Sequence, residues 1–147
     1  MGKTTENLNS ILKNTKDIGQ FMEDNESHFA ERNLGAYLHK LLKEKNMKKS
    51  DVFKRAGGVI SASYGYDIFN NNRKPTRNIV IALCFGLGLN PDEANHLLNY
   101  ASLGILYPRI RRDSIIIFAL SNNIDIDKCN YLLMDSGEET IHKDNFS

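Results

Sequence analysis

The sequence predicts an all-α protein, on three observations. Apolar residues recur at the spacing of one helix face along most of the 147 residues. Gly and Asn stand where several of these apolar stripes end, as they do at helix C-termini. A segment that starts at Arg77 is echoed by one that starts at Arg112, 35 residues later. A repeat of this period is typical of helical units that stack side by side.

An N-terminal helical arm is expected over residues 1–33. Its apolar positions fall in two groups with a polar break at Asn14-Thr15 between them. They are Leu8, Ile11 and Leu12, then Ile18, Phe21 and Met22. This spacing predicts two helical stretches with apolar faces. Such an arm could extend freely, form a dimer surface or pack on the main body, and the sequence leaves these alternatives open.

The next segment, 34–102, is expected to form the main domain, beginning with three helices. Leucines at helical spacing predict a first helix over 34–46. A second is expected over 50–56, with Ser50 as N-cap and a left-handed Gly57 or Gly58 at its end. A third is expected over 61–70, from Ser61 to the Asn run at 70–72, since Asn tolerates the left-handed conformation.

Two further helices complete the main domain. Thr76 is the expected N-cap of a helix that reaches about Gly86. The run Asn90-Pro91-Asp92-Glu93 combines an N-cap residue, a Pro at the first helical position and acids in the first turn. It predicts a helix that ends near Ala101.

The repeat predicts a second helical hairpin as an extension over 103–136. Residues 77–85 are echoed by 112–120, and residues 89–98 by 124–133. Each copy is therefore expected to be two helices, with Asn90 or Asp125 capping the second. Tyr107-Pro108-Arg109 is the expected elbow between the copies. The polar segment from Ser136 is expected to fray, which leaves 137–147 as a flexible tail.

The net charge of +1 conceals an uneven distribution. Residues 1–34 carry 4 Lys and Arg against 6 Asp and Glu, and residues 80–147 carry 5 against 9. Residues 35–79 carry 10 against 3. A local positive field favours polyanions such as the nucleic-acid backbone, although a solvated basic face without a ligand would have the same composition.

The basic segment holds two short helices joined by a Gly-containing turn, which is the sequence form of a helix-turn-helix. Residues 34–101 resemble the Xre-type (Cro/phage-repressor) helix-turn-helix family, and 102–136 resemble the helical extension of its short bacterial regulators. The landmarks that carry the resemblance are Leu38, Leu41, Val52, Ala56, Ile68-Phe69-Asn70, Arg73, Pro75, Thr76 and Leu87-Gly88-Leu89.

The resemblance implies binding to double-stranded DNA as a sequence-specific transcriptional regulator, with the second and third helices at the major groove. Five residues of the third helix would then face base edges: Ser61, Ala62, Ser63, Tyr66 and Asp67. Five cations would flank the groove and hold phosphates: Lys48, Lys49, Arg73, Lys74 and Arg77. A homodimer on a two-fold operator is the expected assembly.

Two departures from the family pattern carry structural expectations. The turn Gly57-Gly58-Val59-Ile60 is about two residues longer than the family's tight turn, which is expected to tilt the third helix. Gly65 replaces a bulky residue, so the third helix is expected to approach its neighbour closely. The alternative function keeps the fold but uses the exposed face for a protein partner, and the acidic, apolar extension is a possible surface for one.

Other classes of function have little support in the sequence. Cys84 and Cys129 each lie in an apolar periodic stretch, which indicates reduced core cysteines in a cytoplasmic protein. The four histidines show no ligand spacing with them, so no metal or other cofactor is expected. No nucleophile–base pair is recognisable, so we expect no enzyme. No apolar run approaches the length that spans a bilayer, so no membrane partner is expected.

Overall fold

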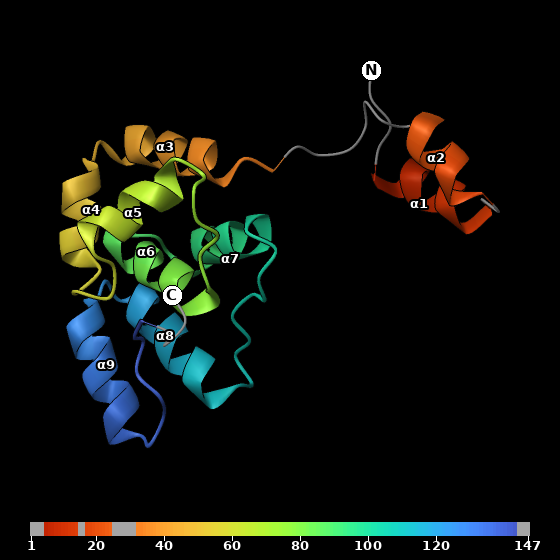
Figure 1. Cartoon of the computed structure of the whole chain (residues 1–147). Helices are drawn as coiled ribbons and strands as arrows, with labels where there is room; N and C mark the ends of the chain where they lie inside the picture. Colours follow the sequence, from red (N-terminus) through yellow and green to blue (C-terminus); the bar gives the residue numbers. More distant parts are fainter. Residues whose placement is uncertain (1–4, 15–16, 25–31, 144–147) are drawn as a thin grey trace. The chain divides into compact units, whose positions relative to one another are not determined.

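The computed structural model describes residues 5–14, 17–24 and 32–143, and all regular secondary structure within these ranges is α-helical (Figure 1). The all-α prediction is therefore confirmed. The chain divides into two compact units, Met1–Arg32 and Asn33–Ser147. Each is described here by itself.

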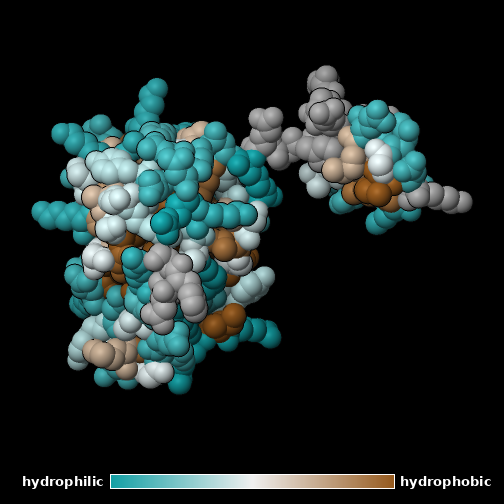
Figure 2. Space-filling model, viewed as in Figure 1, coloured by the Kyte–Doolittle hydropathy of each residue, from teal (hydrophilic) through white to brown (hydrophobic). Residues whose placement is uncertain are grey.

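The smaller unit contains α1 (Thr5–Asn14) and α2 (Ile18–Asp24). Phe21 is its one buried large side chain among the described residues, with 5% of its surface exposed. Three apolar side chains remain exposed: Leu12, Ile18 and Met22. Figure 2 shows hydrophobic atoms at the surface of this unit. The helices follow the predicted apolar spacing, while the role of the arm stays a prediction.

The larger unit begins with α3 (Leu34–Lys45), α4 (Lys49–Arg55) and α5 (Ala62–Phe69). The third helix begins beside Ser61, as expected, and the Ser61 side chain caps it by accepting a hydrogen bond from the Tyr64 amide. The predicted cap of α4 is wrong. Lys48 holds the N-cap position without a side-chain hydrogen bond, and Ser50 lies inside the first turn.

Close packing fixes α5 against its two neighbours. A Cβ atom on Gly65 would lie only 2.3 Å from the Phe53 ring of α4, so the absence of a side chain permits this approach. The expected close contact is thereby confirmed. At the other end of α5, Asn71 has φ of 62° and its Oδ1 accepts a 2.8 Å hydrogen bond from the amide of Gly35 in α3. The Asn run thus ends the helix and attaches it to α3.

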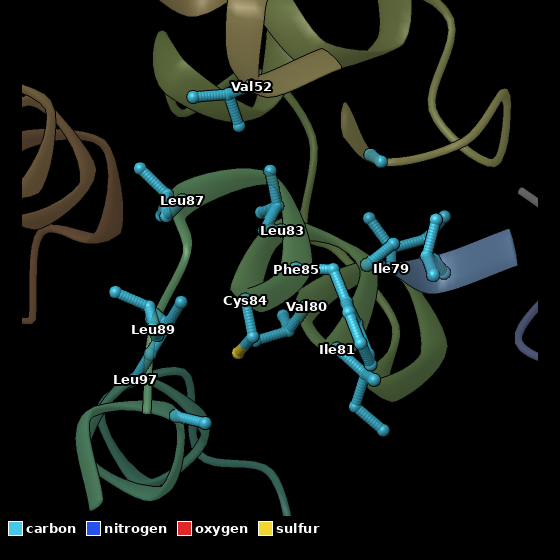
Figure 3. Close-up of a cluster of buried hydrophobic side chains, with 14 of the residues drawn as sticks. Val52, Ile79, Val80, Ile81, Leu83, Cys84, Phe85, Leu87, Leu89 and Leu97 are labelled. Carbon is cyan, nitrogen blue, oxygen red and sulfur yellow. The ribbon is translucent and has the colours of Figure 1, made fainter. Parts of the chain in front are cut away.

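Helix α6 (Arg77–Leu87) is the centre of the larger unit. All its residues from Ile79 to Leu87 are buried. Figure 3 shows Val52 of α4 on the side of α6 that carries Leu83 and Leu87. Thr76 is at the N-cap position as predicted, but its side chain makes no capping hydrogen bond. Its Oγ1 is buried without a hydrogen-bond partner among the described residues.

The repeat is completed by α7 (Pro91–Tyr100), α8 (Arg111–Ser121) and α9 (Ile126–Asp135). Gly88 and Asn123, which are equivalent in the repeat, both have positive φ, of 67° and 53°. The next amide in each copy bonds back to an equivalent carbonyl, with Leu89 N to Cys84 O at 3.0 Å and Ile124 N to Ala119 O at 2.9 Å. The predicted repeat is confirmed down to these backbone hydrogen bonds.

Each copy ends in an extended strap that returns along its own hairpin. The Leu106 amide donates to Asn95 Oδ1 at 2.9 Å, and the equivalent Ile141 amide donates to Asn130 Oδ1 at 2.7 Å. Leu106 and Ile141 are both buried, with 3% and 1% of their surface exposed. The copies therefore span 77–106 and 112–141. As far as Ile141, the structure differs from the frayed tail expected after Ser136, because this apolar side chain fills a core position.

An arginine at the start of each copy holds the strap of that copy. Arg77 donates to the carbonyl oxygens of Gly104 and Ile105 at 2.9 and 3.0 Å. Arg112 donates to those of Glu139 and Thr140 at 2.9 and 3.2 Å. These hydrogen bonds are equivalent under the 35-residue shift.

The same arginines also join the two copies. Arg77 forms an ion pair with Asp113, with 3.0 Å between Nη2 and Oδ2. Arg112 donates to Asn78 Oδ1 at 2.9 Å. Since Asn78 and Asp113 are equivalent positions, each copy gives the other the same contact that it receives. Such reciprocal contacts are the mark of a two-fold arrangement, here within one chain.

Candidate functional site

The candidate site is the outer face of α5. Of the five residues predicted to face base edges, Ser61, Ala62, Ser63 and Tyr66 are exposed and Asp67 is half-buried. The inward positions are Tyr64, Gly65, Ile68 and Phe69, all of them buried. The apolar side of α5 therefore packs against α3 and α4. Its polar side and the Tyr66 ring are exposed to solvent.

On one side of this face lie the cations at the start of α4. Lys48 is exposed, and Lys49 begins the helix. The Lys49 Nζ lies 5.6 Å from the Tyr66 ring centroid and 5.5 Å from that of Phe69. These cation–π contacts place the Lys49 charge beside the exposed ring of α5. That Lys48 and Lys49 flank the groove and hold phosphates stays a prediction.

On the other side lies the basic turn after α5. Arg73 and Lys74 are both exposed. The Arg73 guanidinium lies 4.8 Å from the centroid of the Tyr64 ring. Tyr64 thus anchors α5 through its buried surface and supports a cation at its edge. The Asn71 turn, tied to α3, fixes the direction from which these two side chains project.

Arg77 is a correction to the predicted set. Its Nε and both Nη atoms donate to Gly104 O, Ile105 O and the carboxylate of Asp113. Asp113 itself is only 2% exposed. A phosphate contact would have to replace a buried ion pair, so Arg77 is better explained as the clamp between the two copies.

The sequence interpretation missed Lys143. Its Nζ lies 6.0 Å from the Tyr64 ring centroid, on the same aromatic ring that supports Arg73. A hollow of about 180 Å³ opens here, lined by Ser61, Ser63, Tyr64, Asp67, Arg73 and Lys143. The available signal was the repeat itself. Ile141 is equivalent to Leu106, and extending the repeat to that pair would have identified a strap instead of a tail.

A larger cavity, of about 350 Å³, lies where the ends of α4, α6 and α8 meet the start of α9. Six of its lining residues form three equivalent pairs from the two copies: Phe85 and Leu120, Gly88 and Asn123, Leu89 and Ile124. Lys54, Arg55, Asp125 and Asp127 add charges of both signs. The mixed charge does not favour an anion or a cation, so this cavity has no clear relation to the basic face of α5.

The two cysteines are core residues. Cys84 and Cys129 are fully buried. Burial raises the pKa of both thiols, that of Cys129 to about 11 despite the opposing charge of Arg112. Protonated, buried thiols are poor nucleophiles and poor metal ligands. Among the described residues there is also no group of three or more His, Cys, Asp or Glu placed to hold a metal ion.

The comparisons with known proteins do not add to this site: no protein-family profile, curated protein or solved structure matches the chain. Within the described ranges, none of the helices combines the length and the apolar character that crossing a membrane requires.

Proposed function

We propose that this protein binds double-stranded DNA sequence-specifically and regulates transcription, as the Xre-type resemblance implies. The observation that carries the proposal is the exposed polar face of α5, with the Lys49 ammonium beside the Tyr66 ring and the Arg73 guanidinium beside the Tyr64 ring. A major groove admits one helix, and phosphates border it on both sides. In this proposal α4 and α5 are the two helices of the motif, and α5 is the recognition helix.

The two classes of residue have different tasks. The cations hold phosphates, which supplies affinity for any sequence and sets the orientation of the protein. Ser63, Tyr66 and Asp67 provide the contacts that distinguish bases. A serine hydroxyl can donate or accept, so it specifies weakly, whereas the Asp67 carboxylate can accept from the N4 amino group of cytosine. Buried contacts of Tyr64, Ile68 and Phe69 hold this face in place.

A homodimer on a two-fold operator is part of the proposal. Five large apolar side chains are exposed in and just before the second copy of the repeat: Tyr107, Ile110, Phe118, Tyr131 and Met134. Burying these side chains against a second copy of the chain would remove apolar surface from water and so favour dimerisation. Two recognition helices would then read half-sites about 34–36 Å apart, or a multiple of that distance.

The test begins with selection from random duplexes at about 0.15 M salt. We expect the wild type to enrich one sequence. Ser63→Ala with Tyr66→Ala should reduce binding to that sequence and leave weak binding to a scrambled duplex nearly unchanged, since base contacts discriminate. Arg73→Ala with Lys74→Ala should weaken binding to both duplexes. It should also reduce the slope of log K against log salt by about 1.8, at roughly 0.9 per phosphate contact.

A matched control is Lys128→Gln, because Lys128 is an exposed cation on α9, outside the proposed interface. It should change neither the selected sequence nor the slope. A wild type that enriches no sequence would exclude the regulator. An enriched sequence that survives the Ser63 and Tyr66 changes would place base reading on another surface.

The alternative, a protein-interaction module, is favoured by one observation. Phe118 is 53% exposed, although its equivalent in the first copy, Leu83, is completely buried. A surface of this kind suits a protein partner. Under this alternative, the wild type binds no duplex and Phe118→Ser abolishes capture of the partner while the fold is retained.

A further inference from the structure

We infer that the C-terminal strap is part of the DNA interface, and that Lys143 and Arg73 together bind one backbone phosphate at the start of α5. This inference rests on the proposed function and adds to it a contact that follows the helix-turn-helix by about 70 residues. It also gives the second copy of the repeat a role in DNA binding, namely to hold the strap that carries Lys143.

The first argument is the convergence of two cations on one aromatic ring. The Arg73 guanidinium and the Lys143 ammonium lie 4.8 and 6.0 Å from the Tyr64 ring centroid. Both line the same hollow of about 180 Å³. Two like charges that line one hollow repel each other, and an anion bound in that hollow would be attracted to both.

The second argument is the set of donors around the hollow. Ser61 Oγ accepts from the Tyr64 amide at 3.2 Å, and a hydroxyl that accepts still has its own hydrogen to donate. Ser63 lines the same hollow and is exposed. The positive end of the α5 dipole adds to the field there. A phosphate oxygen therefore meets the Ser61 hydroxyl as well as two cations, and Ser63 stays with the proposed base-reading residues.

The third argument is the sign of the net charge. Asp67 also lines the hollow and brings one negative charge. Within the described ranges, the ion pairs of the protein include neither Arg73 nor Lys143. Two cations against one carboxylate leave a net positive charge, which favours a phosphate over a free cation. Asp67 lies one turn after Ser63 on α5 and is itself one of the proposed base-reading residues.

The strap that carries Lys143 is fixed by the repeat. Asn130 receives a hydrogen bond from the Ile141 amide at 2.7 Å and donates one to the Ile141 carbonyl at 3.1 Å. Arg112 holds the preceding carbonyls of Glu139 and Thr140. The buried Ile141 side chain completes the anchor, two residues before Lys143. Asn130 is therefore a positioning residue for the proposed phosphate contact.

The test measures binding of the full chain to a random-sequence duplex over a salt series, which reports phosphate contacts without requiring the operator. Lys143→Gln should reduce the log–log salt slope by about 0.9, the value for one lost contact. Lys128→Gln is the matched control, with the same chemical change on exposed α9, and should leave the slope at the wild-type value.

A second variant tests the role of the strap. Asn130→Ala should produce a similar loss of slope, and adding Lys143→Gln to it should produce little further loss, because the two changes remove the same contact. Helix content measured at each salt concentration shows whether Asn130→Ala remains folded. If it unfolds, Lys143→Gln alone still decides the question.

Failure of the proposed function and failure of this inference give different experimental results. A wild type that binds no duplex refutes both the proposed function and this inference. Duplex binding with an unchanged slope in Lys143→Gln, or tighter binding by that variant, refutes the inference alone. Tighter binding would mean that the strap obstructs α5.

Discussion

The two copies of the repeat share a backbone but differ in their surroundings. Residues 77–106 and 112–141 repeat the same left-handed caps, the same strap and the same arginine clamp. Helix α6 of the first copy is covered by α4, whereas Phe118 on α8 of the second copy is exposed to solvent. The hydrogen bonds of a copy therefore depend on its own sequence, and its burial depends on its neighbours.

The substitutions between copies follow this difference. Positions that make the same hydrogen bond keep Arg, Asn or a residue that tolerates positive φ, as at Arg77 and Arg112, or Gly88 and Asn123. Positions whose surroundings differ have diverged, as the buried Leu83 and the exposed Phe118 show. Each of the following predictions compares an equivalent pair.

The largest expected effect comes from the two arginine clamps. Arg77→Ala leaves Asp113, only 2% exposed, as an uncompensated carboxylate, and should cost about 3–5 kcal/mol in the free energy of unfolding. Arg112→Ala leaves only the neutral Asn78 amide and two carbonyls without this donor, and should cost about 1–3 kcal/mol. Urea unfolding of both variants measures the difference.

The buried charge is tested by a second change. Adding Asp113→Asn to Arg77→Ala removes the carboxylate and makes the position resemble Asn78. It should recover part of the lost stability. Equal costs for Arg77→Ala and Arg112→Ala, with no recovery, would show that the charge of Asp113 is not the cause.

The second prediction compares the outer faces of α6 and α8. Leu83→Ala should cost about 2–5 kcal/mol, because this fully buried side chain packs on the side of α6 that Val52 covers. Phe118→Ala, at the equivalent position, should change stability by about 0.5 kcal/mol or less in the monomer. Thermal unfolding at low protein concentration measures both. A large cost at Phe118 that grows with concentration would instead indicate a dimer through α8.

The smallest expected effect is at Glu93 and its equivalent Lys128. Burial raises the pKa of Glu93, but hydrogen bonds from Lys45 and from the Asn90 backbone outweigh it, so the pKa lies below its ordinary value. Its Oε2 lies 2.8 Å from Lys45 Nζ. A lowered pKa in the folded state stabilises above the ordinary glutamate value of about 4.3, and this contribution is lost as the pH falls through the folded pKa.

Glu93→Gln should therefore cost about 0.5–1 kcal/mol at pH 7, and its difference from the wild type should shrink toward about pH 3. Lys128→Gln should show no such change over this range, because no carboxylate is altered. Urea unfolding at both pH values measures the two variants. A pH-independent cost at Glu93 would assign its effect to packing.

Local structure was largely predictable from particular residues. Asn90 and Asp125 cap helices as expected, because an N-cap hydrogen bond involves only residues within one turn. The N-cap of α4 was not predictable in this way: Lys48 holds it and not Ser50, because any of several consecutive polar residues can begin a helix. Gly65 was interpretable in advance, because the loss of a side chain on a packed face requires a close neighbour.

By itself, the sequence determined the helices, their period of 35 residues, and a basic segment with an exposed polar helix face. These depend on neighbours within a few residues, or on similarity between two segments. Only the tertiary structure decided that Arg77 forms an ion pair with Asp113. It also decided that the segment after Ser136 folds back and places Lys143 beside the Tyr64 ring. Those facts depend on groups about 30 to 80 residues apart. No periodicity specifies which distant partner a charged side chain will meet, because that choice is made by the packing of the whole core.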